Sequence, residues 1–181
     1  MYKTLLITFM AIMVFAVNKS NAQFRMSAGT TDIALRVGVG FPKTEKFSAY
    51  DKFKASTPAI GFTFETGLWN FGLSAGGEFN YAKYQDDTKT KDMSVLMGII
   101  FLKYYTPLVF NKIATYGRLD LLPIGVFKIS PASGSSSGAK SIYGIYAGAN
   151  YQLADKLGVF AELGSGYTTF NAGLSWRVAE Q

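Results

Sequence analysis

The feature that most constrains this chain is a repeated alternation of apolar residues with small or polar ones, over segments of about ten residues. In the segment 33–41 every odd position is apolar, whereas the even positions carry Ala34, Arg36, Gly38 and Gly40. The segment 170–178 repeats the pattern. Because successive side chains of a strand point to opposite faces, the alternation predicts β-strands with one apolar face each.

Eight segments of this kind follow one another along the chain. We expect strands near 33–41, 59–66, 71–84, 93–106, 114–128, 141–153, 157–164 and 170–178. Pro123 lies inside the fifth segment and predicts a bulge at Leu122-Pro123, because proline cannot donate a ladder hydrogen bond. The fourth segment is apolar on both faces from Met93 to Leu102.

The connections between these segments alternate in length. Those at 43–58, 85–92 and 129–140 are long, and those at 67–70, 107–113 and 154–156 are shorter. The connection at 165–169 is also short. Membrane β-barrels show this asymmetry between outer loops and periplasmic turns. The pattern therefore predicts both termini on the periplasmic side and three long outer loops.

Either a soluble or a membrane β-barrel could account for this alternation. A soluble barrel would point its apolar side chains inward and cover itself with lysine, glutamate and threonine. Here the face opposite the apolar one carries glycine, serine, alanine and isolated charges, which suits the crowded inside of a narrow membrane barrel. Aromatic residues near strand ends fit interfacial girdles, namely Phe41, Trp69, Phe71, Tyr84, Tyr104, Tyr105, Tyr151 and Trp176. We expect an all-β fold, an eight-stranded antiparallel up-and-down transmembrane β-barrel in the outer membrane of a Gram-negative bacterium.

The N-terminus has the pattern of a secretory signal peptide. Lys3 supplies the charged start, 5–17 is an apolar run, and Ser20-Asn21-Ala22 is a small-residue cleavage site. The apolar run is too short for a spanning helix. We therefore expect a leader at 1–22 and one barrel domain at 23–181. Its removal lowers the net charge from +6 to +4, which is too mild to indicate nucleic acid.

Cysteine and histidine are both absent from the 181 residues. Their absence removes disulfides, thiolate metal sites, the commonest general base and the commonest metal ligand. We expect no cofactor, no bound metal and no catalytic residue.

Three segments resemble a known group. They are Phe101-Leu102-Lys103-Tyr104-Tyr105, Ala161-Glu162-Leu163-Gly164-Ser165-Gly166-Tyr167 and Ala172-Gly173-Leu174-Ser175-Trp176-Arg177-Val178. In these the chain resembles the small outer-membrane β-barrels of the OmpX, OmpA-barrel and opacity-porin type, in particular the Bacteroidetes forms. That family usually stops at a terminal aromatic residue, whereas here Val178 is followed by Ala179-Glu180-Gln181. Barrels of similar architecture that are enzymes use histidine, so the resemblance implies no enzymatic activity here.

The alternation sends eight charged side chains to the inside of the barrel, four basic and four acidic. They are Arg36, Glu65, Glu78, Lys103, Arg118, Asp120, Glu162 and Arg177. Because buried charges must be paired, we interpret them as a formally neutral structural ion network. The alternative is a narrow polar conduit for ions.

The first outer loop carries lysines interleaved with aromatic residues. Its candidate contact residues are Lys43, Lys46, Phe47, Lys52, Phe53 and Lys54. Such a segment could meet outer-membrane lipids or lipopolysaccharide, could bind a protein partner, or could be a solubilising loop with its aromatic residues on the barrel rim.

Two polar stretches are interpreted as loops. The stretch 134–141 lacks the second glycine of a phosphate-binding loop and is expected to be a flexible surface loop. The acidic stretch 85–92 matches no calcium-loop spacing and is expected to be a solvated loop tip.

The leading functional hypothesis is a non-enzymatic barrel whose outer loops serve surface interaction or envelope integrity. The alternatives are a small porin-like barrel passing ions or very small solutes, and an accessory subunit of an envelope machine.

Overall fold

The computed structural model describes residues 26–40, 53–86, 91–107, 112–131 and 136–179. The predicted leader at 1–22 lies outside these residues. The described part is built from strands: β1 (Thr31–Val39), β2 (Phe53–Ala55), β3 (Ala59–Gly67), β4 (Leu73–Asp86), β5 (Lys91–Tyr105), β6 (Ile113–Pro131), β7 (Ser136–Lys140), β8 (Ile145–Gln152), β9 (Leu157–Ser165) and β10 (Phe170–Ala179). No helix among the described residues is long and apolar enough to cross a membrane.

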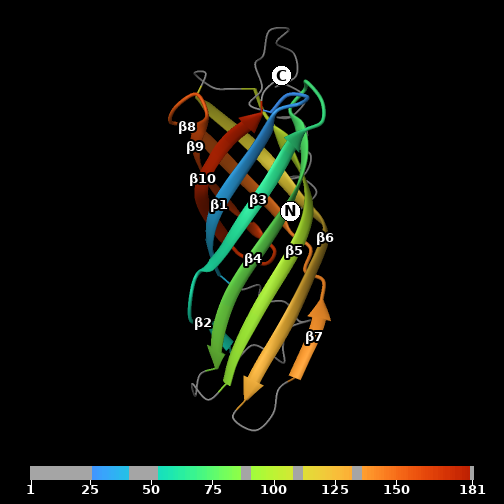
Figure 1. Ribbon diagram of the computed structural model, residues 1–181, viewed down its shortest axis with the longest axis vertical. Helices are drawn as coiled ribbons and strands as arrows, with labels where there is room; N and C mark the ends of the chain where they lie inside the picture. The colour runs from blue at the N-terminus through green and yellow to red at the C-terminus, as the bar shows by residue number, and fades with distance from the viewer. Residues whose placement is uncertain (1–25, 41–52, 87–90, 108–111, 132–135, 180–181) are drawn as a thin grey trace, which may run out of the picture.

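The strands close into a barrel. Antiparallel pairing runs in the order β4-β3-β1-β10-β9-β8-β6-β5, and β5 pairs with β4 to complete the ring. Closure occurs where β1 pairs with β10, for example at Leu35 and Leu174. The predicted eight-stranded antiparallel up-and-down barrel is confirmed (Figure 1).

The two remaining strands extend existing ones. Strand β2 pairs with β4 beyond the end of β3, and β7 pairs with β6 beyond the end of β8. Between β7 and β8 the chain leaves the ladder at 141–144, so the predicted strand 141–153 is regular only as β8. Strand β6 has a bulge at Leu121, because Ile100 pairs with Leu122 and Phe101 pairs with Asp120. The bulge was predicted one residue later, at Leu122-Pro123.

The barrel is much taller on one side. Strands β4, β5 and β6 have 14, 15 and 19 residues, whereas β1, β3 and β9 have 9 each. The ends of β4, β5 and β6 that lie away from the short turns, flanked by β2 and β7, therefore form a sheet beyond the rest of the ring; we call it the projecting sheet. It lies at the end opposite the C-terminus in Figure 1.

All three expected long loops are wrong in extent, and the first, 43–58, contains β2. Strand β4 runs to Asp86 and β5 starts at Lys91, so Gln85 pairs with Asp92 inside the ladder. Likewise β6 runs to Pro131, and Ser136–Lys140 forms β7 rather than a flexible surface loop. A strand that extends into water can carry polar residues on both faces. Such an extension lacks the apolar alternation, so its sequence resembles that of a loop.

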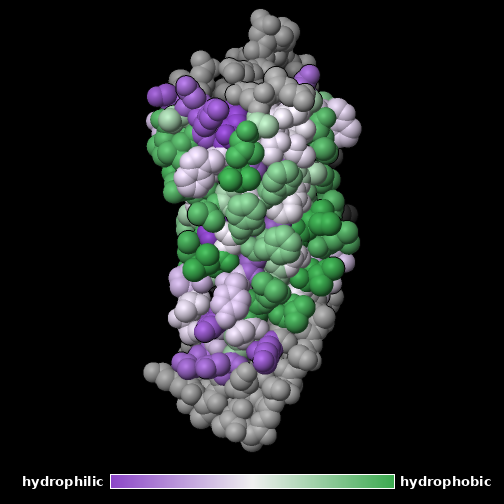
Figure 2. All heavy atoms as spheres, viewed as in Figure 1, coloured by the Kyte–Doolittle hydropathy of each residue, from purple (hydrophilic) through white to green (hydrophobic). Residues whose placement is uncertain are grey.

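The outside of the barrel carries an apolar belt. Side chains that point outward are large and exposed, among them Ile60 at 62%, Phe79 at 65% and Ile124 at 63%. Figure 2 shows the belt between more hydrophilic residues at the two ends of this face. Trp69, Phe71, Tyr151 and Trp176 are exposed as expected of girdles. Tyr84 and Tyr105 are buried inside instead, because they share the inward face of their strands.

The lumen is filled at three levels. Met26 packs with Tyr105, Ala114 and Tyr116 near the end that holds the short turns. Charged side chains fill the middle. Toward the projecting sheet an apolar cluster occupies the inside, because the inward face of β5 is apolar as well; its members are Ala59, Ala82, Tyr84, Met93, Val95, Met97, Ile99, Phe101, Ile142 and Tyr167. Burial raises the pKa of the Tyr167 phenol, so this hydroxyl stays neutral in the cluster.

Candidate functional site

The inward charges come from seven strands. The structure places Arg36 on β1, Glu65 on β3, Glu78 on β4, Lys103 on β5, Arg118 and Asp120 on β6, Glu162 on β9 and Arg177 on β10. The first seven of these residues are at most 7% exposed. Each occupies an alternate position of its strand, which is why the side chains share the lumen.

Glu162 is the centre of one half of this network. Its Oε2 accepts a hydrogen bond of 2.9 Å from Arg36, and its Oε1 lies 3.7 Å from the Lys103 ammonium. Arg118 lies 3.7 Å away as a third cation. The Tyr116 hydroxyl donates at 3.0 Å and the Asn171 amide at 3.4 Å. One carboxylate is thus shared by three cations, so its removal would leave all three poorly compensated.

Glu78 is the second anionic centre. Arg36 and Arg118 both donate to its Oε2, and the Asn80 amide donates to its Oε1. Arg36 therefore bridges Glu78 and Glu162, which come from strands on opposite sides of β1 in the ring order. Charge-assisted bonds of this kind fix the geometry of the groups they join.

Lys103 and Glu65 form a third part of the network. The Lys103 ammonium donates to Glu65 at 2.8 Å, and the Ser74 hydroxyl donates to the other carboxylate oxygen at 2.5 Å. The ammonium also lies 4.8 Å from the ring centroid of Tyr116 and 5.1 Å from that of Phe101. These aromatic faces stabilise the ammonium in addition to the carboxylates of Glu65 and Glu162.

Asp120 has fewer partners than Glu78 or Glu162. Its Oδ1 accepts a bond of 2.8 Å from Arg118 Nε, and its Oδ2 is buried without a hydrogen-bond partner in the described part of the chain. Arg118 is also engaged with Glu78 and lies 4.3 Å from the ring centroid of Phe101.

Arg177 lies apart from this network. It forms an ion pair of 3.4 Å with Asp32, which is 5% exposed. Sequence reasoning missed Asp32 because it lies just before the segment in which alternation was counted. With Asp32 included, the described inward set has five acidic and four basic residues, so the expectation of a formally neutral lumen is wrong.

Little space remains between these side chains. A cavity of about 20 Å³ lies among Arg36, Glu65, Lys103, Asn150 and Glu162, with room for about one water molecule. Within the described ranges no three acidic, histidine or cysteine side chains are grouped so as to hold a metal ion.

The outer-loop residues are only partly described. Lys43, Lys46, Phe47 and Lys52 lie outside the described residues. Phe53 and Lys54 belong to β2, where their backbones pair with Asp86 and Gln85. The structure thus attaches the end of this segment to the projecting sheet.

No family model and no curated protein matches the chain. Solved structures do match. The N-terminal β-barrel domain of OprF from Pseudomonas aeruginosa is 12% identical with a TM-score of 0.59, covering 84% of this chain and 99% of that one. The fold is that of the small outer-membrane β-barrels.

Two further structures agree in fold. Ail of Yersinia pestis, in complex with the heparin analogue sucrose octasulfate, is 14% identical with a TM-score of 0.52, covering 83% of this chain and 99% of that one. The outer membrane protein OprG of Pseudomonas aeruginosa is 12% identical with a TM-score of 0.52, covering 86% and 98% respectively.

Proposed function

We propose that this protein is a non-enzymatic outer-membrane barrel of a Gram-negative bacterium, closed to solutes, that uses its outer end for surface contact. The observation that carries the proposal is the contrast between a filled lumen and a projecting sheet. The exposed apolar belt supports a position in a bilayer, since such a belt in water would cause aggregation. The signal-peptide pattern of the sequence at 1–22 supports export.

The packing of the lumen supports the closed state. Arg36 and Arg118 bridge carboxylates across the lumen, and the apolar cluster fills the inside toward the outer end. An eight-stranded barrel is just wide enough for side chains to fill it. The lumen network is therefore proposed as a structural element that holds the barrel shut, in place of a conduit.

The projecting sheet supplies a contact surface. Among the described residues β7 pairs only with β6, and β2 pairs only with β4, so each leaves one edge without a partner strand. The backbone groups of an edge strand can accept a strand from another chain. We propose a protein partner that binds at the β7 edge.

The lysine-rich segment supplies a second contact. Lys54 lies in β2, at the projecting sheet, and Lys43, Lys46 and Lys52 precede it in the sequence. Ail was solved with a polyanionic heparin analogue. We propose that this segment, with Phe47 and Phe53, contacts anionic groups such as lipopolysaccharide phosphates.

Cross-linking tests the surface contact. A photoreactive residue replacing Ser137 on β7 should capture a partner on intact cells, whereas the same residue at Lys156, in a turn at the other end, should not. Equal capture from both positions would contradict the proposal.

Conductance tests the closed state. The purified barrel in planar bilayers should show no stable openings of nanosiemens size. Stable openings would instead favour the porin-like alternative, and co-purification of a fixed envelope complex would favour the accessory-subunit alternative.

A further inference from the structure

The outer face of the projecting sheet changes character over three successive rows of side chains. Strands β4, β5 and β6 pair in register, so each row contains one outward residue per strand. Toward the outer end the rows are Tyr81, Leu96 and Val126, then Lys83, Ser94 and Lys128, then Gln85 and Asp92. The apolar belt on this side thus ends at a row with two lysines.

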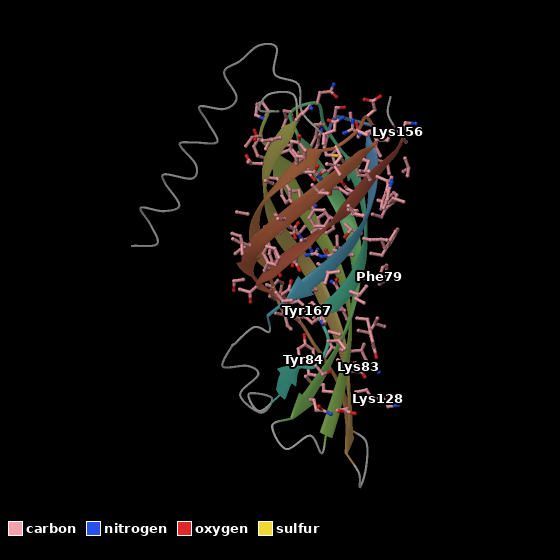
Figure 3. All side chains as sticks on the ribbon, turned by 90° about the vertical axis from the view of Figure 1, so that its left-hand side faces the viewer. Phe79, Lys83, Tyr84, Lys128, Lys156 and Tyr167 are labelled. Carbon is pink, nitrogen blue, oxygen red and sulfur yellow. The ribbon has the colours of Figure 1, made fainter. Side chains whose placement is uncertain are left out.

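Lys83 and Lys128 are placed to act together. Both side chains are exposed, and neither forms an ion pair with a described residue. Their strands flank β5, so their Cα atoms are about 10 Å apart, two strand spacings. In Figure 3 both project from the same side of the sheet, away from Tyr84 on the inside. Two flexible lysine stems can converge over that distance on one anion, above the half-buried Ser94.

The neighbouring rows restrict the kind of anion. Leu96 is 54% and Val126 51% exposed directly beside the lysine row, and Phe79 continues the apolar surface farther from the outer end. This surface suits acyl chains. Asp92 lies one row farther out, about 7 Å along the strand, and accepts a hydrogen bond of 3.0 Å from Gln85. Its negative charge disfavours an anion in that outer row.

We infer that Lys83, Ser94 and Lys128 form a binding site for the phosphate of an outer-leaflet glycolipid of the lipid A class. The lysines bind the phosphate as point charges, the Ser94 hydroxyl donates a hydrogen bond, and the acyl chains lie on the apolar row. A free phosphate shares the first two contacts and lacks the third. The inference rests on the proposed membrane position and is independent of the proposed protein partner.

Native mass spectrometry of the full barrel, released from bilayers, can count bound lipid. Vesicles would contain phosphatidylcholine with lipid A, with dephosphorylated lipid A, or with phosphatidylglycerol. We expect wild-type protein to retain phosphorylated lipid A in preference to the other two lipids. Each lysine near a charged surface is worth about fivefold in affinity, so Lys83→Gln with Lys128→Gln should weaken retention by roughly 30-fold.

A matched variant keeps the test specific. Lys112→Gln with Lys156→Gln removes two exposed lysines from turns at the opposite end and should leave lipid A retention unchanged. Equal losses in both double variants, or no preference for the phosphorylated lipid, would overturn the site. Binding of inorganic phosphate that competes with lipid A at millimolar concentration would overturn the assignment to a lipid. Failure of the wild type to insert into vesicles would overturn the membrane position as well.

Discussion

Glu162 of β9 accepts a hydrogen bond of 2.9 Å from Arg36 of β1, a residue 126 positions earlier in the chain. The two strands are separated by β10 in the ring, so this bond joins strands that do not pair with each other. Lys103 of β5 and Arg118 of β6 approach the same carboxylate from the other side of β9 in the ring order. The carboxylate of Glu162 therefore connects β9 with β1, β5 and β6 inside the barrel.

Glu162→Ala should lower the free energy of unfolding by roughly 3 to 5 kcal/mol, because three buried cations lose a shared partner. Unfolding in detergent, followed by the gel shift between folded and heated barrel, would measure this. Asp155→Asn, at an exposed turn residue, is the matched control and should change stability by less than about 0.5 kcal/mol. Unchanged stability in both variants would contradict the structural role of the network.

Asp120→Asn should cost much less than Glu162→Ala, about 1 kcal/mol or less. Its carboxylate bonds only Arg118 among the described residues, and one of its oxygens has no hydrogen-bond partner. Neutralising it also removes one negative charge from an inward set with an acidic excess. The same unfolding measurement decides: a loss as large as that of Glu162→Ala would show that Asp120 is a principal member of the network.

Gly76→Ala and Gly77→Ala should differ although the two glycines are neighbours. A Cβ on Gly76 would lie 2.3 Å from the carbonyl oxygen of Phe64 and 2.5 Å from the Phe101 ring. A Cβ on Gly77 would meet only the Ile99 carbonyl oxygen at 4.0 Å. We expect a loss of about 1 to 3 kcal/mol for Gly76→Ala and almost none for Gly77→Ala. Equal losses would mean that the lumen has more room than the structure shows.

Phe79→Arg tests whether the apolar belt faces lipid. Phe79 is 65% exposed, so in a water-soluble barrel a charge there would be tolerated. In a bilayer it should cost about 2 to 4 kcal/mol near the midplane, measured by unfolding in vesicles. Gln85→Arg on the same strand, outside the belt, should be close to neutral. A neutral Phe79→Arg in vesicles would argue against the membrane position.

Single cysteines can map the two ends, because the chain has none of its own. Ser137→Cys on β7 should react with a membrane-impermeant maleimide on intact cells, and Lys156→Cys should react only after the outer membrane is opened. The reverse pattern would invert the barrel, with the projecting sheet on the periplasmic side.

The sequence by itself determined the strands, their faces and the class of barrel. Alternation with a period of two requires only local geometry, so Arg36, Glu65 and Glu162 could be assigned to the inside without knowing any neighbour. The sequence of β5 is apolar on both faces from Met93 to Leu102, so by the same local rule one apolar face points into the lumen and fills it.

The tertiary structure alone decided which of these groups meet. The height of a side chain in the lumen depends on the stagger of successive strands, which no single segment encodes. Arg36 reaches Glu78 and Glu162, whereas Arg177 meets Asp32 at another level. The sequence also does not show where the strands end. The ladder continues through polar residues such as Gln85 and Asp92 wherever a neighbouring strand is present to pair with them. The row of Lys83, Ser94 and Lys128 exists only through that pairing, because β-sheet register joins residues that are far apart in the chain.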